Sequence, residues 1–144
     1  MQTIHPDRLR ADLPEVPARA GRFEFGLEDL HDVRSLVATA ASAGGLPPGR
    51  ASDLVIAASE LAANSIMHGG GRGEARVWGE DGTVIVEVAD AGTITGPMGG
   101  QSRPDPSIEH GRGLNIAGRL CDEMVIDSGP TGTRIRLRMF TAAG

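Results

Sequence analysis

The stretch EARVWGEDGTVIVEVAD at residues 74–90 constrains the fold more than any other part of the sequence. Apolar and polar residues alternate on both sides of Asp81-Gly82, and an Asp-Gly pair between two such runs predicts a β-hairpin. A second hairpin is predicted near the end of the chain, where DEMVIDS and TRIRLRMF flank a Gly-Pro-Thr-Gly turn. Hairpins favour an antiparallel or mixed sheet, whose helices cover one face only.

Three other segments show apolar residues at helical spacing. They cover residues 27–43, 47–68 and 111–121. Together with a short alternating strand at 22–26, these elements predict an α/β (α+β) two-layer sandwich. Its sheet would be mixed and mostly antiparallel, with about five strands and with three helices on one face.

The chain of 144 residues has the size of one compact domain, which we expect over residues 22–144. Residues 1–21 carry three prolines among charges and are predicted to form a loosely ordered arm. Residues 91–111 are rich in glycine and proline and show no periodicity. A loop of about twenty residues is unusual in so small a domain, so we interpret it as a functional lid.

Composition excludes several classes of function. The net charge of -5 gives no basic surface for direct nucleic-acid binding, and no apolar run is long enough to span a membrane. The N-terminus lacks the apolar core of a signal peptide, so we expect a cytoplasmic protein. All 14 basic residues are arginine. The P-loop and the protein-kinase fold both need a lysine at the phosphates, so both are excluded.

The second predicted helix carries an unusual line of polar residues. Glu60, Asn64 and His68 follow an i, i+4, i+8 track on a mostly apolar cylinder. A buried carboxylate or amide without a partner costs free energy, so such residues need a reason to lie there. One reading is a solvent-facing hydrogen-bonded pair, and the other is a binding site.

Two further patterns suggest a ligand, although each also fits ordinary turn chemistry. Asp90 ends a predicted strand, where its carboxylate can accept a hydrogen bond from an exocyclic amino group, and Gly92 lets the backbone approach a flat ring. Gly111-Arg112-Gly113 precedes the third helix, whose N-terminus suits an anion such as phosphate. The hydroxyl of Thr133, which opens the last strand, is placed to reinforce Asp90.

Taken in order, these motifs resemble one family. A helix with Glu-x-x-x-Asn, a strand with Asp-x-Gly, a long lid, a Gly-x-Gly helix and a Gly-Thr strand are similar to the GHKL ATPase superfamily with the Bergerat ATP-binding fold. More narrowly, the chain resembles the bacterial anti-sigma-factor serine/threonine kinases over roughly residues 22–140. It departs from their first glycine box at Ile94, which replaces a second glycine and puts the lid geometry in question.

The resemblance implies a site for ATP and Mg²⁺. Glu60 would be the catalytic base, and Asn64 would supply the metal ligand. The remaining nucleotide contacts would come from His68, Asp90, Gly92, Gly111, Arg112, Gly113, Leu114 and Thr133.

Two functions follow from the resemblance. One is a kinase that binds a sigma factor and phosphorylates a serine or threonine of a STAS-type antagonist. The alternative is a non-catalytic module that binds partners through the same surface, with ATP as a structural ligand or absent. The sequence leaves the oligomeric state open, although members of the family often form homodimers.

Overall fold

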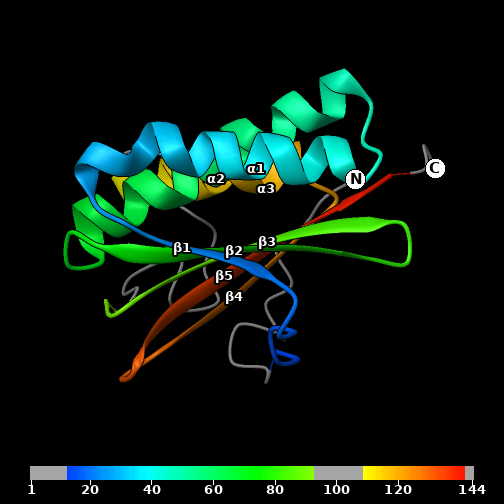
Figure 1. The fold of residues 1–144 in the computed structure, drawn as a ribbon. Helices are drawn as coiled ribbons and strands as arrows, with labels where there is room; N and C mark the ends of the chain where they lie inside the picture. Colours follow the sequence, from blue (N-terminus) through cyan, green and yellow to red (C-terminus); the bar gives the residue numbers. More distant parts are fainter. Residues whose placement is uncertain (1–12, 93–108, 142–144) are drawn as a thin grey trace.

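The computed structural model describes residues 13–92 and 109–141, with the side chains of 109–112 left out (Figure 1). Five strands form one sheet in the order β1-β2-β3-β5-β4, and the three α-helices lie together on one of its faces. The elements are β1 (Gly21–Phe25), η2 (Leu27–Asp29), α1 (Leu30–Ala43), α2 (Pro48–His68), β2 (Gly73–Glu80), β3 (Thr83–Asp90), α3 (Glu109–Leu120), β4 (Glu123–Gly129) and β5 (Gly132–Phe140). This confirms the predicted two-layer sandwich.

The hairpin at Asp81-Gly82 forms as predicted. Both turn residues have positive φ angles, 45° and 73°, which an Asp-Gly pair tolerates better than most pairs. Each of the four strand pairings among the described residues is antiparallel. The sheet is therefore antiparallel throughout these residues, which is simpler than the mixed sheet that the sequence left open.

Two helix starts differ from the prediction. The first helix begins at Leu30 rather than Leu27, because Leu27–Asp29 form a 3-10 turn in which Asp29 Oδ2 accepts the N–H of Gly26 at 2.8 Å. The third helix begins at Glu109, two residues before the expected start. Most of the predicted lid, including Ile94, lies outside the described residues.

The turn between α1 and α2 is fixed by hydrogen bonds that cap α1. The N–H of Leu46 donates to the carbonyl of Ala41 at 3.0 Å, and the N–H of Gly45 donates to Ser42 at 3.1 Å. This is the Schellman arrangement, and the φ of 93° at Gly45 explains why glycine stands there. Leu46 is buried, so α2 starts from an anchored turn.

The main core lies between the helices and the sheet. α2 packs between α1 and α3, and its Leu54 and Leu61 are fully buried. In β5 the sequence TRIRLRM alternates, so that Ile135, Leu137 and Met139 enter this core while the intervening arginines point to the other face. α2 is thus the central helix of the layer, and two of its polar residues, Asn64 and Ser65, are buried.

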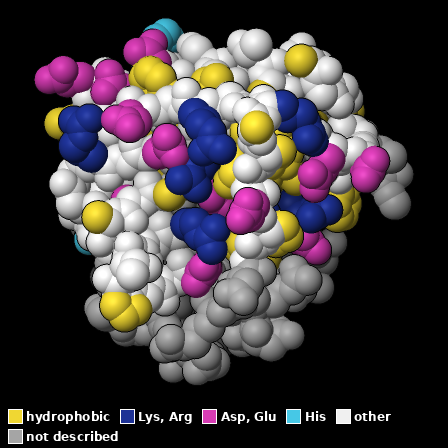
Figure 2. Space-filling model, turned by 60° about the horizontal axis from the view of Figure 1, so that its bottom comes forward, with side chains coloured by type: hydrophobic (Ala, Val, Ile, Leu, Met, Phe, Trp, Pro, Cys, Tyr) yellow, Lys and Arg dark blue, Asp and Glu magenta, His cyan; other side chains and the backbone are white. Residues whose placement is uncertain are grey.

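A second buried cluster lies on the helix-free face of the sheet. Trp78 and Ile85 are buried there, together with Glu87, whose side chain is 0% exposed. Glu87 pairs with the guanidinium groups of Arg76 at 2.5 Å and Arg136 at 2.8 Å, as a fully buried carboxylate requires. Figure 2 shows this face, where arginine and acidic side chains alternate with apolar ones.

The described part of the expected N-terminal arm is attached to this helix-free face. Arg136 donates to the carbonyl of Pro14 at 2.8 Å, and Arg19 donates to the carbonyl of Gly79 at 2.7 Å. Residues 13–20 of the predicted N-terminal arm therefore lie against this face.

Two further features of the fold concern Cys121 and the length of the helices. Cys121 is buried, and burial raises the pKa of its thiol to about 12, as suits a small apolar core residue. Among the described residues, none of the helices combines the length and the apolar character that a membrane span requires.

Candidate functional site

Asp90 lies at the end of β3, where two groups hold its carboxylate. The hydroxyl of Ser65, on α2, donates to Oδ2 at 2.6 Å, and the N–H of Gly92 donates to Oδ1 at 2.8 Å. Each carboxylate oxygen has two lone pairs, so these bonds leave acceptor capacity for one more donor. The predicted base-reading carboxylate is therefore held in a fixed orientation with room to accept a hydrogen bond.

Glycines bring the backbone close to Asp90 on three sides. A Cβ atom on Gly69 would lie 2.3 Å from Asp90 Cγ, and a Cβ on Gly92 would lie 2.7 Å from the Cα of Gly69. Gly132 has a φ of 133°, and a Cβ there would lie 2.5 Å from the carbonyl oxygen of Asp90. A larger residue at Gly69 would displace the carboxylate, and one at Gly92 or Gly132 would displace neighbouring main chain. The sequence indicated this role for Gly92, but it marked Gly69 only as a helix stop.

Thr133 stands opposite Asp90 in the β3–β5 register, yet its hydroxyl bonds elsewhere. It donates to the carbonyl of Gly92 at 2.8 Å, and it lies 2.7 Å from the hydroxyl of Ser128. A hydroxyl donates only once, so Ser128 is the donor in the second bond. Thr133 thus fixes Gly92, two residues after the carboxylate, rather than the carboxylate itself as the sequence suggested.

Asn64, on the polar track of α2, is 8% exposed, and its Oδ1 has no hydrogen-bond partner among the described residues. The solvent-facing reading of the track fails for this residue. An unsatisfied buried amide oxygen is rare and costs about 1–3 kcal/mol. A neutral oxygen with free lone pairs is a ligand that Mg²⁺ accepts, together with phosphate oxygens and waters. The residue therefore fits the metal that the resemblance implies.

The two other members of the track lie in different surroundings. Glu60 is half-buried, and its Oε1 faces α3 so closely that a Cβ on Gly113 would lie 3.1 Å away. His68 is exposed at the C-terminal end of α2. Glu60 and Asn64 are thus one helical turn apart on the central helix, whereas His68 lies at the rim.

The predicted phosphate-binding residues lie within α3 and not before it. Because the helix starts at Glu109, Gly111-Arg112-Gly113 belong to its first turns. Leu114 is fully buried in the core, so only its main chain could face a ligand. The side chain of Arg112 lies outside the described residues.

Sequence reasoning missed Ser65 and Ser128. Ser65 falls among the apolar residues of α2 that face the sheet, and it is 1% exposed. A buried hydroxyl needs a hydrogen-bond partner, so a serine among apolar residues was the sequence signal that could have predicted a bond from Ser65. Ser128 had no comparable signal, because its role depends on the pairing of β4 with β5.

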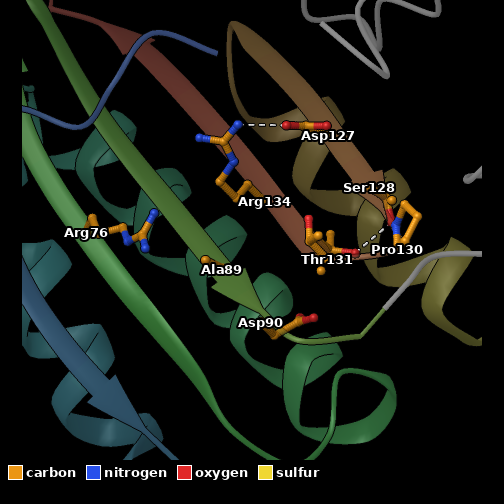
Figure 3. A pocket seen from close by; sticks show the side chains of 11 residues that line it. Arg76, Ala89, Asp90, Asp127, Ser128, Pro130, Thr131 and Arg134 are labelled. Atoms are coloured by element: carbon orange, nitrogen blue, oxygen red, sulfur yellow. Dashed lines mark hydrogen bonds and ion pairs between the residues drawn. The ribbon is translucent and has the colours of Figure 1, made fainter. Parts of the chain in front are cut away.

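A hollow of about 540 Å³ lies at the same end of the sheet (Figure 3). No residue of α2 lines it, but Asp90 and Thr133 do, so it adjoins the site that the polar track and Asp90 form. Arg76 and Arg134 lie on its wall, and Arg134 pairs with Asp127 at 2.7 Å. The other lining residues are Ala89, Asp90, Ser128, Gly129, Pro130, Thr131, Gly132 and Thr133.

The fold and the site define an antiparallel α/β sandwich with a strand-end carboxylate set against a buried central helix. The family model of the histidine kinase-like ATPase domain matches residues 23–139. The chain therefore belongs to the histidine kinase-like ATPase domain family. No curated protein gives a significant match to the sequence.

Solved structures share this fold at low sequence identity. The chain is similar to the RsbU and RsbW domains of Rv1364c from Mycobacterium tuberculosis, with a TM-score of 0.60 and 18% identity over 86% of this chain. It spans only 33% of that larger chain. It is also similar to the Acinetobacter baumannii histidine kinase AdeS, with a TM-score of 0.51 and 8% identity, covering 87% of this chain and 70% of that one. Both likenesses concern the fold.

Titration of Asp90 gives a prediction about stability. Burial raises the pKa of this carboxyl above its ordinary 3.8, against the opposing hydrogen bonds from Ser65 and Gly92. The folded state therefore binds the proton of Asp90 more tightly than the unfolded state does. This tighter binding stabilises the fold at low pH, and the stabilisation is lost as the pH rises above that ordinary value. The unfolding free energy of the wild type relative to Asp90→Asn should therefore fall as the pH rises above the ordinary 3.8 of an aspartate carboxyl.

Urea unfolding at a series of pH values measures this difference. Glu28→Gln, which changes an exposed carboxyl on η2, reports the background. A difference that rises with pH would mean that the fold favours the ionised form of Asp90, contrary to this account.

Proposed function

We propose that this domain binds ATP with Mg²⁺ and transfers phosphate to a serine or threonine of a protein, as an anti-sigma-factor kinase. The buried, unpartnered Oδ1 of Asn64 carries this proposal, because a metal ligand is the simplest reason to retain such an atom. Membership of the histidine kinase-like ATPase family supports a nucleotide as the partner of that metal.

The adenine end of the nucleotide is assigned to Asp90. Its carboxylate accepts from Ser65 and Gly92 and retains a lone pair for the exocyclic amino group of adenine. Gly69 and Gly92 keep side chains away from this position, so a flat ring can approach the backbone.

The phosphate end is assigned to the first turns of α3. There the main chain of Gly111, Gly113 and Leu114, with Arg112, would face the triphosphate, because the N-terminal turn of a helix attracts anions. Thr133 and His68 complete the proposed nucleotide contacts, the first by holding Gly92 and the second at the rim of α2.

Glu60 is the proposed catalytic base. When bound, Mg-ATP supplies the phosphoryl group and the charge that neutralises the phosphates. Glu60 accepts the proton of the attacking hydroxyl, while the oxygen of that hydroxyl bonds to the terminal phosphorus and the bond to ADP breaks. The half-buried position of Glu60 against Gly113, one turn from Asn64, supports this role.

The proposed protein partners are a sigma factor and a STAS-domain antagonist, with the antagonist as the phosphate acceptor. Support comes from the motif order and from the shared fold with a structure that contains an RsbW domain. The alternative is a non-catalytic module that binds its partners with ATP as a structural ligand or without it. The buried Asn64 oxygen supports a protein that binds Mg-ATP over a module without nucleotide, and the half-buried Glu60 one turn away favours the kinase over a module in which ATP is only structural.

The role of Asn64 can be tested by comparing metal-bound with metal-free ATP. Asn64→Ala should weaken binding of ATP in magnesium at least tenfold, or about 1.4 kcal/mol, and should change binding in EDTA much less. Isothermal titration calorimetry measures both, and Ser52→Ala, an exposed position on the same helix, is the matched control. Equal losses in magnesium and EDTA would make Asn64 a structural residue.

The role of Glu60 can be tested by separating binding from transfer. Glu60→Gln keeps the shape but removes the basicity, so ATP affinity should change only a few-fold while transfer to a STAS-domain protein falls by about 10²–10⁴. Transfer from labelled ATP gives the rate, and Asp53→Asn on the same helix is the control.

Unchanged transfer in Glu60→Gln would exclude Glu60 as the base. A wild type that binds ATP and a sigma factor but phosphorylates no STAS-domain protein would favour the non-catalytic module.

A further inference from the structure

Ser65 connects the end of α2 to the end of β3 through both its side chain and its main chain. Its hydroxyl donates to Asp90 Oδ2 at 2.6 Å, and its carbonyl accepts the N–H of Gly69 at 2.7 Å. Gly69 is the residue whose Cβ, if it had one, would lie 2.3 Å from Asp90 Cγ. The same serine therefore holds the carboxylate and closes the last turn of the helix beside it.

The two oxygens of the Asp90 carboxylate have one described donor each. Oδ2 accepts from Ser65, and Oδ1 accepts from the N–H of Gly92 at 2.8 Å. Rotation of an aspartate carboxylate about its Cβ–Cγ bond is otherwise only weakly restricted. Because one oxygen is held from the helix and the other from the main chain after β3, the two bonds together set the plane of the carboxylate.

The hydroxyl of Ser65 also favours the ionised form of Asp90. Burial raises the pKa of this carboxyl, and the hydrogen bonds from Ser65 and Gly92 oppose that rise. Ser65 is 1% exposed, so bulk water does not reach its side chain. A carboxylate is a stronger acceptor for an amino group than a neutral carboxyl. Loss of the hydroxyl would therefore weaken Asp90 as an acceptor as well as free it to turn.

The place of Ser65 on α2 separates the base end of the site from the metal end. Asn64 and Ser65 are consecutive, so their side chains leave the helix about 100° apart. The Oδ1 of Asn64 has no hydrogen-bond partner among the described residues, whereas the Ser65 hydroxyl is committed to Asp90. A change at Ser65 should therefore act on the carboxylate and leave the amide in place.

We propose that Ser65 is a positioning residue for base recognition, which orients the Asp90 carboxylate so that a lone pair faces the exocyclic amino group of adenine. This inference rests on the proposed function, because it takes the ligand to be ATP. It adds that discrimination between purines depends on a helix residue that acts through Asp90. The alternative is a serine that merely satisfies its own buried hydroxyl and contributes to stability alone.

Purine riboside triphosphate tests the proposal, because it differs from ATP in lacking the exocyclic amino group. Isothermal titration calorimetry in magnesium gives the affinity of each variant for both triphosphates. The wild type should bind ATP at least about tenfold more tightly than the analogue, as expected for one hydrogen bond to a charged acceptor. In Ser65→Ala this ratio should fall to about threefold or less, mainly through weaker binding of ATP.

Further variants separate positioning from stability. Ser65→Cys nearly keeps the size of the side chain but offers only a weak S–H donor, so its ratio should also fall. Ser52→Ala, at an exposed position on α2, should keep the wild-type ratio. Circular dichroism checks that each variant is folded, and Ser65→Cys decides the question if Ser65→Ala is not. Comparing two ligands on one variant cancels a general loss of competent protein.

The outcomes distinguish this inference from the proposed function. Equal losses of affinity for the two triphosphates in Ser65→Ala would leave the ratio unchanged, and would make Ser65 a structural residue while the proposed function stands. A wild type that binds ATP and the analogue equally would overturn base recognition by Asp90, and the role of Ser65 with it. A wild type that binds neither triphosphate would overturn the proposed function itself.

Discussion

The hydrogen bond from Ser65 to Asp90 joins the two layers of this domain at the point where the candidate site lies. Ser65 belongs to the central helix α2, which packs between α1 and α3, and Asp90 ends the central strand β3. The bond fixes the carboxylate relative to the helix that carries Glu60 and Asn64. The carboxylate proposed to bind adenine and the amide proposed to bind Mg²⁺ are therefore held relative to each other by one contact between helix and sheet.

The close approach of the two layers explains the glycines around this bond. Gly69 follows α2 directly, and Gly92 follows the carboxylate by two residues. A side chain at either position would meet the Asp90 carboxylate or the Gly69 backbone at less than 3 Å. The hydroxyl of Thr133, on β5, then donates to the carbonyl of Gly92, and the hydroxyl of Ser128, on β4, bonds to that of Thr133. The start of the segment beyond Gly92 is thus anchored by β4 and β5.

Local patterns in the sequence predicted the fold and the helix on which two candidate site residues lie. Alternation around Asp81-Gly82 and the helical spacing in α2 depend on neighbouring residues only, and both elements lie where they were expected. The spacing of Glu60 and Asn64 likewise placed them on one line of a largely buried helix.

Features that depend on contacts between distant segments could not be predicted in this way. The partner of Thr133 follows from the β3–β5 register, and the partner of Ser65 follows from the distance between helix and sheet. The start of α3 was placed too late because Gly111 was taken as a helix boundary, although the helix includes it. The attachment of residues 13–20 requires Arg136, more than a hundred residues away.

The central claim is that Asp90 reads the amino group of adenine, and base selectivity tests it most directly. Calorimetry with ATP and GTP in magnesium should give at least tenfold tighter binding of ATP, because the carboxylate repels the O6 acceptor of guanine. Asp90→Asn offers an amide that can donate to O6, so the preference should shrink or reverse. Equal affinity of the wild type for the two nucleotides, or an unchanged preference in Asp90→Asn, would contradict the account.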